Sequence, residues 1–185
     1  VNLGDEHVLE NMARSMVHRG PDDQGLASFV NSQGAYVGLA SRRLAILDLS
    51  PAGHMPMTTP DGRYTIVYNG EVYNFPELRE ELAAQGCQFR TKTDTEVIVN
   101  LYETYGLDFV KKLRGMFAIG IYDIKKHRLV LARDHIGIKP LYYSVKPGNK
   151  NLVFGSELKT ILQYPGIDRE IDPAALDFFL TLEYI

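Results

Sequence analysis

The sequence of 185 residues contains little cysteine, no long apolar run and no excess of basic residues. Its one cysteine, Cys87, excludes an intramolecular disulfide framework and is typical of a reducing, cytoplasmic environment. No stretch has the length and apolarity of a membrane span or of a leader peptide. The 20 Lys and Arg residues are scattered among 23 Asp and Glu, without the basic stripe of a nucleic-acid binder. We therefore expect a cytoplasmic protein that binds neither membrane nor nucleic acid.

The sequence also lacks the spacing of a metal site. The side chains that might be combined into one are His18, Asp22, Asp23, Asp48, His54, Asp134 and His135. None of them forms an HExxH motif or a Cys/His pair, so structural or solvated roles are expected and no metal is predicted. We expect His18, Arg19 and Asp22 to support a binding pocket through hydrogen bonds.

The composition, 45% hydrophobic and 23% charged, is that of one ordinary globular domain. The chain begins at Val1 without a methionine and ends on the apolar pair Tyr184-Ile185. We interpret both ends as cut, and expect the sequence to be a piece of a longer protein.

Short strands alternate with a few helices along the chain. Residues 6–16 place Val8, Leu9, Met12 and Met16 on one helical face. Strands are expected within 24–47 around a turn at 31–34, at 64–68, as a pair at 115–124 and 128–133, and as a pair at 140–145 and 151–155. Because hairpins dominate, the sheets should be antiparallel with helices on their outer faces, which is an α+β fold.

Two helices should begin at capping boxes, one at Asn74 with Glu77 and one at Thr93 with Glu96. Glycines at 86 and 106 should end them. A further helix should start at Asp172-Pro173, with the proline in its first turn. Asn69-Gly70 is most often a hairpin turn. Here residues 71–73 are interpreted as a loop into a helix, which places Asn69-Gly70 at the end of a strand.

Four polar clusters lie at strand ends or helix starts, where a scaffold presents reactive groups. They are residues 18–23, 42–48, 68–74 and 91–97. An arginine can bind a carboxylate with two parallel hydrogen bonds, and carboxylates such as Glu71 and Asp94 can accept from an ammonium group. Asn69 and Gly70 offer an amide side chain and an unobstructed backbone N–H, as in an oxyanion hole. A small zwitterion such as an α-amino acid is a plausible ligand, although not a unique one.

Seven motifs follow one another along the chain: HRGPDDQG, RLAILD, NGEVYNFPELR, TDTEVI, LRGMFAIGIYD, ARDHIGIKPLYY and FGSELKTIL. In this order they resemble class II glutamine amidotransferase domains of the asparagine synthetase type. The resemblance implies an N-terminal-nucleophile hydrolase fold, a four-layer α/β/β/α sandwich with two stacked antiparallel sheets. It divides the chain into an amidotransferase domain at 1–164 and a connector at 165–185 that leads toward a synthetase domain.

The resemblance also implies the roles of individual residues. Asn69 and Gly70 match the oxyanion hole, and Glu71 and Asp94 match the residues that meet the α-amino group of L-glutamine. Arg43 matches the arginine that holds the glutamine α-carboxylate. The other matched residues of the same strand are Leu44, Ala45, Ile46 and Leu47. Arg42 is expected to face the opposite way, because side chains alternate along a strand.

In such enzymes the nucleophile is an N-terminal cysteine whose own α-amino group acts as general base. The two groups titrate at about 8.5 and about 7.7–8.0, so proton transfer between them near neutral pH costs little. This sequence has no Cys-Gly-Ile start. Cys87 follows Gly86 at the expected start of a strand and is interpreted as a small buried or half-buried residue. We expect the nucleophile a few residues before Val1.

The leading hypothesis is the glutaminase domain of an asparagine synthetase, which supplies ammonia for ATP-dependent amidation of aspartate. No cofactor is expected in this domain, and ATP and Mg²⁺ belong to the synthetase domain of the same polypeptide. Two alternatives remain open: a module that binds glutamine or is only structural and lacks a nucleophile, and an amidotransferase with another acceptor. A homodimer is considered, but the sequence does not determine the oligomeric state.

Overall fold

The structure is a computed structural model that describes residues 6–32, 34–44, 53–145 and 151–183. Within these ranges, eight strands form one four-stranded sheet, in the order β3-β4-β5-β6, and two two-stranded sheets, β1-β2 and β7-β8. All strand pairs in the described part of the chain are antiparallel. The α+β class with hairpin-dominated sheets is therefore confirmed.

The strands are β1 (Asp23–Val30), β2 (Tyr36–Arg43), β3 (Met57–Thr58), β4 (Tyr64–Val72), β5 (Gly115–Asp123), β6 (Arg128–Arg133), β7 (Tyr142–Val145) and β8 (Leu152–Gly155). The helices are α1 (Glu6–Arg14), η1 (Val17–Arg19), α2 (Phe75–Ala84), α3 (Asp94–Tyr105), η3 (Gly106–Lys112), α4 (Leu158–Ile161) and α5 (Pro173–Leu182). The pairs β1-β2, β5-β6 and β7-β8 lie where the sequence predicts them.

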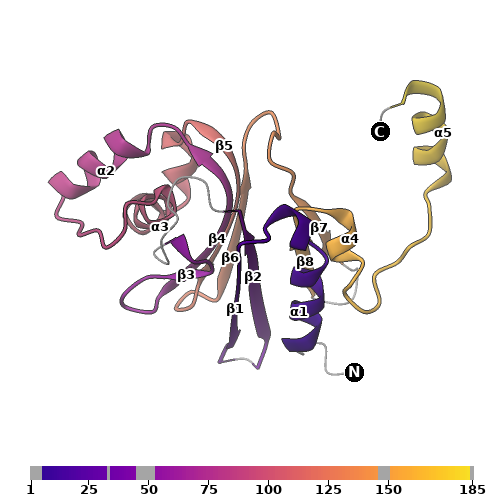
Figure 1. Cartoon of the computed structure of the whole chain (residues 1–185), viewed down its shortest axis with the longest axis horizontal. Coiled ribbons are helices and arrows are strands. Elements are labelled where there is room, and N and C mark those ends of the chain that lie inside the picture. The colour runs from indigo at the N-terminus through magenta and orange to yellow at the C-terminus, as the bar shows by residue number, and fades with distance from the viewer. Residues whose placement is uncertain (1–5, 33, 45–52, 146–150, 184–185) are drawn as a thin grey trace.

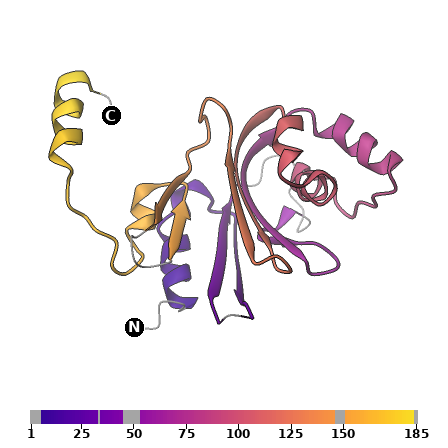
Figure 2. The same ribbon diagram turned by 180° about the vertical axis from the view of Figure 1, so that it is seen from behind.

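The elements form four layers, which Figure 1 shows from left to right. Helices α2 and α3 cover one face of the four-stranded sheet. The pairs β1-β2 and β7-β8 lie on its other face, and α1 and α4 cover their outer side, as the reverse view in Figure 2 also shows. Successive side chains of β4 and β5 point to opposite faces, and both faces carry apolar residues, so each strand contributes to a core on either side. The predicted α/β/β/α layering agrees with this arrangement.

The main core lies between the four-stranded sheet and helices α2 and α3. It contains Ile66, Val72, Leu82, Ile98 and Phe109, all essentially inaccessible to water. A smaller cluster between the sheets joins Leu39 of β2 to Val67 of β4 and Tyr122 of β5. The two clusters hold β4 between them. They stabilise the strand that carries the candidate site.

Three local predictions are wrong in detail. Strand β4 does not end at Tyr68 but continues through Asn69, Gly70 and Glu71 to Val72, paired with β5 throughout. The continuation depends on Gly70, since a Cβ there would lie 2.1 Å from the carbonyl oxygen of Met116. Of residues 71–73, which the sequence interprets as a loop, Glu71 and Val72 therefore belong to the strand, and Tyr73 lies in the turn before α2.

The second correction concerns the two predicted capping boxes. Asn74 makes no side-chain cap, since its side chain bonds to Lys112 and Arg114 in the connection between η3 and β5. Thr93 does cap α3 by accepting from the backbone N–H of Glu96. The Glu96 carboxylate, however, accepts from the backbone N–H groups of Arg90 and Thr91, not from that of Thr93. Tertiary contacts therefore determine the hydrogen-bond partners of the Asn74 and Glu96 side chains.

The third correction concerns Cys87, which does not begin a strand but lies in irregular chain after Gly86. Its thiol is half-buried and packs against the main core, as the sequence interpretation of a small packing residue requires. Helix α5 begins as predicted, with the Asp172 side chain accepting from the backbone N–H groups of Ala174 and Ala175. In Figure 1 this helix stands apart from the body of the protein.

Candidate active site

Between the two sheet layers lies a cavity of about 840 Å³. Its walls include seven consecutive residues of β2, Tyr36 to Arg42, and six consecutive residues at β8, Asn151 to Ser156. Side chains of successive strand residues point to opposite faces. A wall made of every residue in a strand is therefore formed by the backbone edge of that strand. The cavity thus lies along the edges of β2 and β8.

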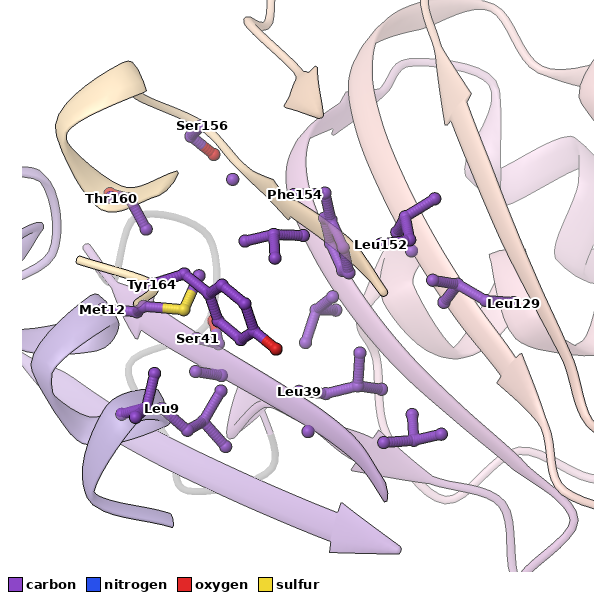
Figure 3. A pocket seen from close by; sticks show the side chains of 18 of the residues that line it. Leu9, Met12, Leu39, Ser41, Leu129, Leu152, Phe154, Ser156, Thr160 and Tyr164 are labelled. Atoms are coloured by element: carbon purple, nitrogen blue, oxygen red, sulfur yellow. The ribbon is translucent and has the colours of Figure 1, made fainter. Parts of the chain in front are cut away.

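The remaining walls come from the helices and the large sheet. Figure 3 shows Leu9 and Met12 of α1 on one side and Leu39, Leu152 and Phe154 around the middle. Val67, Tyr68 and Asn69 of β4 also line the cavity. It is a mainly apolar groove whose lining also includes the polar residues Asn69, Ser41 and Arg42.

Register determines where the backbone N–H of Gly70 points. The hydrogen bonds Ile124 N to Arg63 O (2.9 Å) and Tyr73 N to Arg114 O (2.8 Å) continue the β4–β5 ladder at its two ends. Antiparallel pairs alternate between bonded and non-bonded. The odd-numbered residues of β4 therefore bond to β5, and Gly70 directs its N–H to the opposite edge.

The neighbouring residue Val72 supports this geometry, because its N–H donates to Asp94 Oδ2 at 3.1 Å across that edge. The Gly70 N–H points to the same side of β4 as the Val72 N–H. Asn69 shares the opposite sheet face with Val67, which packs on Leu39 of β2. An amide side chain and a backbone N–H thus adjoin at one position, as an oxyanion hole requires.

Asp94 lies at the first turn of α3 and is 8% exposed. Its Oδ2 accepts from the hydroxyl of Tyr68 at 2.7 Å and from the backbone N–H of Val72. Burial and the adjacent Asp94 carboxylate raise the pKa of Tyr68, so its hydroxyl stays protonated and donates. These two bonds hold Asp94 beside the segment Asn69 to Glu71.

Arg43 and Arg42 point to opposite sides of β2, as predicted. The Arg42 side chain donates to the carbonyl of Gly20 and to Gln24. Arg43 shares a strand face with Leu39, which contacts Val67 of β4. Its guanidinium lies against Gly53, where a Cβ would come within 2.1 Å of Nη2. Arg43 is therefore directed into the space between the sheets.

Glu71 lies on the same face of β4 as Asn69 and is half-buried. Neither side chain has a hydrogen-bond partner or an ion pair within the ranges that the structure describes. The structure thus brings Arg43, Asn69 and Glu71 to facing surfaces and holds Asp94 across the edge of β4. Of the other predicted residues, Leu44 is exposed at the end of β2. Ala45, Ile46 and Leu47 lie outside the described residues.

Sequence reasoning did not identify two carboxylates that organise the surroundings of the site. The first is Asp134, which the sequence suggests only as a possible metal ligand. It accepts the backbone N–H groups of Phe117, Ile138 and Lys139, and these bonds lower the pKa of Asp134 to about 2. Phe117 pairs with Gly70, so Asp134 supports β5 directly opposite the predicted oxyanion hole.

The second carboxylate is Glu157, which joins β8 to the HRG segment. It binds His18, Arg19 and Lys159 at 3.0–3.3 Å. In the sequence, Glu157 is marked only by its place in the FGSELKTIL motif, and the spacing of this motif does not indicate a chemical role for the residue. No group of three metal-ligating side chains occurs in the part of the chain that the structure describes. None of the helices found there has the length and apolarity to cross a membrane.

A family model described as a glutamine amidotransferase domain matches residues 2–185. The chain belongs to the glutamine amidotransferase domain family. It is 41% identical over 180 residues to asparagine synthetase [glutamine-hydrolyzing] 1 of Bacillus subtilis, covering 97% of this chain and 27% of the relative. It is 38% identical to putative asparagine synthetase [glutamine-hydrolyzing] 2 of Methanocaldococcus jannaschii, covering 100% of this chain and 38% of that relative.

This amidotransferase domain therefore spans about a quarter to two fifths of the length of these relatives. Its fold is also that of the glutamine phosphoribosylpyrophosphate amidotransferase from B. subtilis. That structure matches with a TM-score of 0.67 at 18% identity, covering 85% of this chain and 40% of the other. The N-terminal-nucleophile hydrolase fold expected from the sequence is confirmed.

Proposed function

We propose that this amidotransferase domain binds L-glutamine and hydrolyses its side-chain amide to glutamate and ammonia. The observation that carries the proposal is the groove between β2 and β8, whose lining includes Asn69. The cysteine nucleophile would come from a segment upstream of Val1 that occupies this groove as a strand. The glutamine pocket and the groove would then meet at Asn69.

The dimensions and edges of the groove support a strand as its occupant. Its β2 wall is seven residues long, which is about 23 Å at roughly 3.3 Å per residue. Both walls are strand edges, which offer backbone groups to a further strand. A strand between them would join β1-β2 and β7-β8 into one sheet of five and complete the second layer of the sandwich.

The chain direction supports the upstream segment in particular. Helix α1 leads through η1 to Gly20, which packs against the backbone of Arg42 and Arg43 at the far end of β2. Glu157, just after β8, reaches the same end through His18. Helix α1, β2 and β8 therefore run the same way. A strand upstream of Val1 that fills the groove and leads toward the start of α1 would run antiparallel to both β2 and β8.

The chemistry follows from this placement. The thiolate attacks the glutamine side-chain carbonyl, and the resulting oxyanion accepts hydrogen bonds from Asn69 and the Gly70 N–H. The C–N bond breaks, ammonia leaves with a proton held by the terminal amine, and water hydrolyses the thioester to glutamate. Arg43 would hold the α-carboxylate of glutamine, and Glu71 and Asp94 its ammonium group.

For the parent protein, we propose an asparagine synthetase in which ATP and Mg²⁺ act in a following domain that amidates aspartate. Residues 165–185 would be the connector to it. Helix α5 within them exposes Leu176, Phe178, Phe179, Leu180 and Leu182. A helix apolar on all sides is normally buried in a larger structure. The single cysteine makes the cytoplasm the expected compartment.

A second candidate function is an amidotransferase whose ammonia acceptor is not aspartate, because one relative is named as an amidase and not as an asparagine synthetase. The chain is 37% identical over 166 residues to amidase chyE of Penicillium rubens, covering 88% of this chain and 24% of that protein. An acceptor other than aspartate would leave the glutaminase chemistry unchanged.

The test is to express the chain with the residues encoded upstream of Val1 and to measure glutamate release from glutamine. Hydrolysis is expected, and it should disappear when the terminal cysteine is replaced by alanine. A folded, extended protein that binds glutamine but releases no glutamate would support the non-hydrolytic module instead.

A further inference from the structure

Glu157 lies at the junction of three segments that are far apart in the sequence. It follows β8 directly, precedes α4, and contacts η1 about 140 positions earlier in the chain. Its Oε1 atom is 3.0 Å from His18 Nε2 and 3.3 Å from Arg19 Nη1, and its Oε2 atom is 3.1 Å from Lys159 Nζ. One carboxylate thus binds three potentially cationic groups.

The carboxylate is well placed to stay charged. Its side chain is 22% exposed, and this burial favours the neutral form. Hydrogen bonds from His18, Lys159 and Arg19 outweigh the burial and lower the pKa of Glu157 to about 2. Glu157 is therefore an anion throughout the pH range in which glutamine hydrolysis would be measured.

The residues after Arg19 hold the end of β2 on both sides of one peptide bond. The Gly20 carbonyl accepts from Arg42 Nε at 2.7 Å, and the Arg43 carbonyl accepts from the Asp22 N–H at 3.1 Å. Gly20 itself fits against this peptide so closely that a Cβ would lie 2.5 Å from Arg43 N. Gly20 and Asp22, which follow Arg19 directly, therefore support the Arg43 backbone at the end of the β1–β2 pair.

We propose that Glu157 is a positioning residue for glutamine binding, which acts through His18 and Arg19 on Arg43. The inference rests on the proposed function, in which Arg43 holds the glutamine α-carboxylate. A bidentate contact between guanidinium and carboxylate depends strongly on geometry. Loosening residues 18–22 would shift Arg43 and weaken substrate binding, while Asn69 and Gly70 on β4 would keep their places.

The experiment uses the full-length parent protein, with its natural residues before Val1, and compares E157A and E157Q with wild type. We expect E157A to raise KM for glutamine about five- to twentyfold with kcat within about twofold. E157Q keeps the size and one acceptor oxygen, so its KM should rise less. The control is E170A, because Glu170 is exposed and outside this cluster, and its KM should match wild type.

A second readout does not depend on activity. Hydrogen exchange followed by mass spectrometry should show faster exchange in E157A for peptides that contain the Asp22 amide, and unchanged exchange in α3. If E157A fails to fold, E157Q provides both measurements. An unchanged KM, or a fall in kcat at constant KM, overturns the proposal even if exchange at Asp22 accelerates. If the wild-type protein releases no glutamate, the proposed function is overturned. Faster exchange at the Asp22 amide in E157A would in that case still show that Glu157 holds residues 18–22 in place.

Discussion

Tyr68 donates its hydroxyl hydrogen to Asp94 Oδ2 at 2.7 Å, across 26 positions of sequence. The bond joins the middle of β4 to the first turn of α3, inside the main core. Asp94 accepts from Val72 as well, so the carboxylate spans the segment that contains Asn69, Gly70 and Glu71. A helix start and a strand are thereby held in one geometry around the candidate site.

Replacing Tyr68 by Phe tests this relationship. The change removes one hydrogen bond to a buried carboxylate, which should lower the free energy of unfolding by about 1–3 kcal/mol and raise KM for glutamine. Thermal unfolding and steady-state kinetics measure the two effects. Tyr64→Phe is the matched control, because the hydroxyl of this buried tyrosine has no hydrogen-bond partner among the described residues. Equal effects of the two changes would contradict a specific role for the Tyr68–Asp94 bond.

Asn69→Ala should lower kcat for glutamine hydrolysis about a hundredfold or more, since it removes one donor to the oxyanion. The side chain is half-buried and has no hydrogen-bond partner among the described residues, so the stability of the variant should stay close to wild type. Stopped-time glutamate release and thermal unfolding provide both values. A variant that loses stability while keeping kcat would show that Asn69 is structural.

Arg43→Ala should weaken glutamine binding by about 2–5 kcal/mol, and therefore raise KM by about thirtyfold or more. The reason is that a carboxylate left without its bidentate partner loses both hydrogen bonds at once. Arg14→Ala provides the control, because Arg14 is exposed at the end of α1. If both variants keep the KM of wild type, the carboxylate of glutamine binds elsewhere.

The lowered pKa of Asp134 predicts how the stability of the protein depends on pH. Its pKa is about 2 in the folded protein and 3.8 when unperturbed. A lowered pKa contributes stability that is fully present above about pH 4 and is lost as the pH falls toward 2. Asp134→Asn should therefore lower stability at neutral pH and flatten the acid limb between pH 4 and 2. Urea unfolding at a series of pH values tests this.

The control for the acid limb is Asp108→Asn, because Asp108 is an exposed residue paired with Lys111. Exposed pairs contribute little to stability. An acid limb that is the same in Asp134→Asn as in wild type would show that the bonds to Phe117, Ile138 and Lys139 do not control the titration.

Local sequence patterns predicted most of the elements, because their physical cause is local. The hairpin of β5 and β6 follows from two apolar runs around a polar turn, and the start of α5 follows from Asp172-Pro173. The same reasoning failed at Asn74 and at Glu96. An amide or carboxylate near a helix start has several possible backbone donors, and only packing selects among them.

The sequence by itself determined the family, the layer architecture and the identity of the candidate residues Arg43, Asn69, Gly70, Glu71 and Asp94. These follow from the ordered motifs and the family resemblance that the motifs carry, and neither requires knowledge of distances in the structure. Tertiary structure alone decided that β4 continues through Gly70 and that Arg43 and Asn69 lie on facing surfaces of two sheets. It alone connected Glu157 to His18 and Asp134 to Phe117. Such pairs depend on the register of strands and on burial, and these are set only when distant segments pack together.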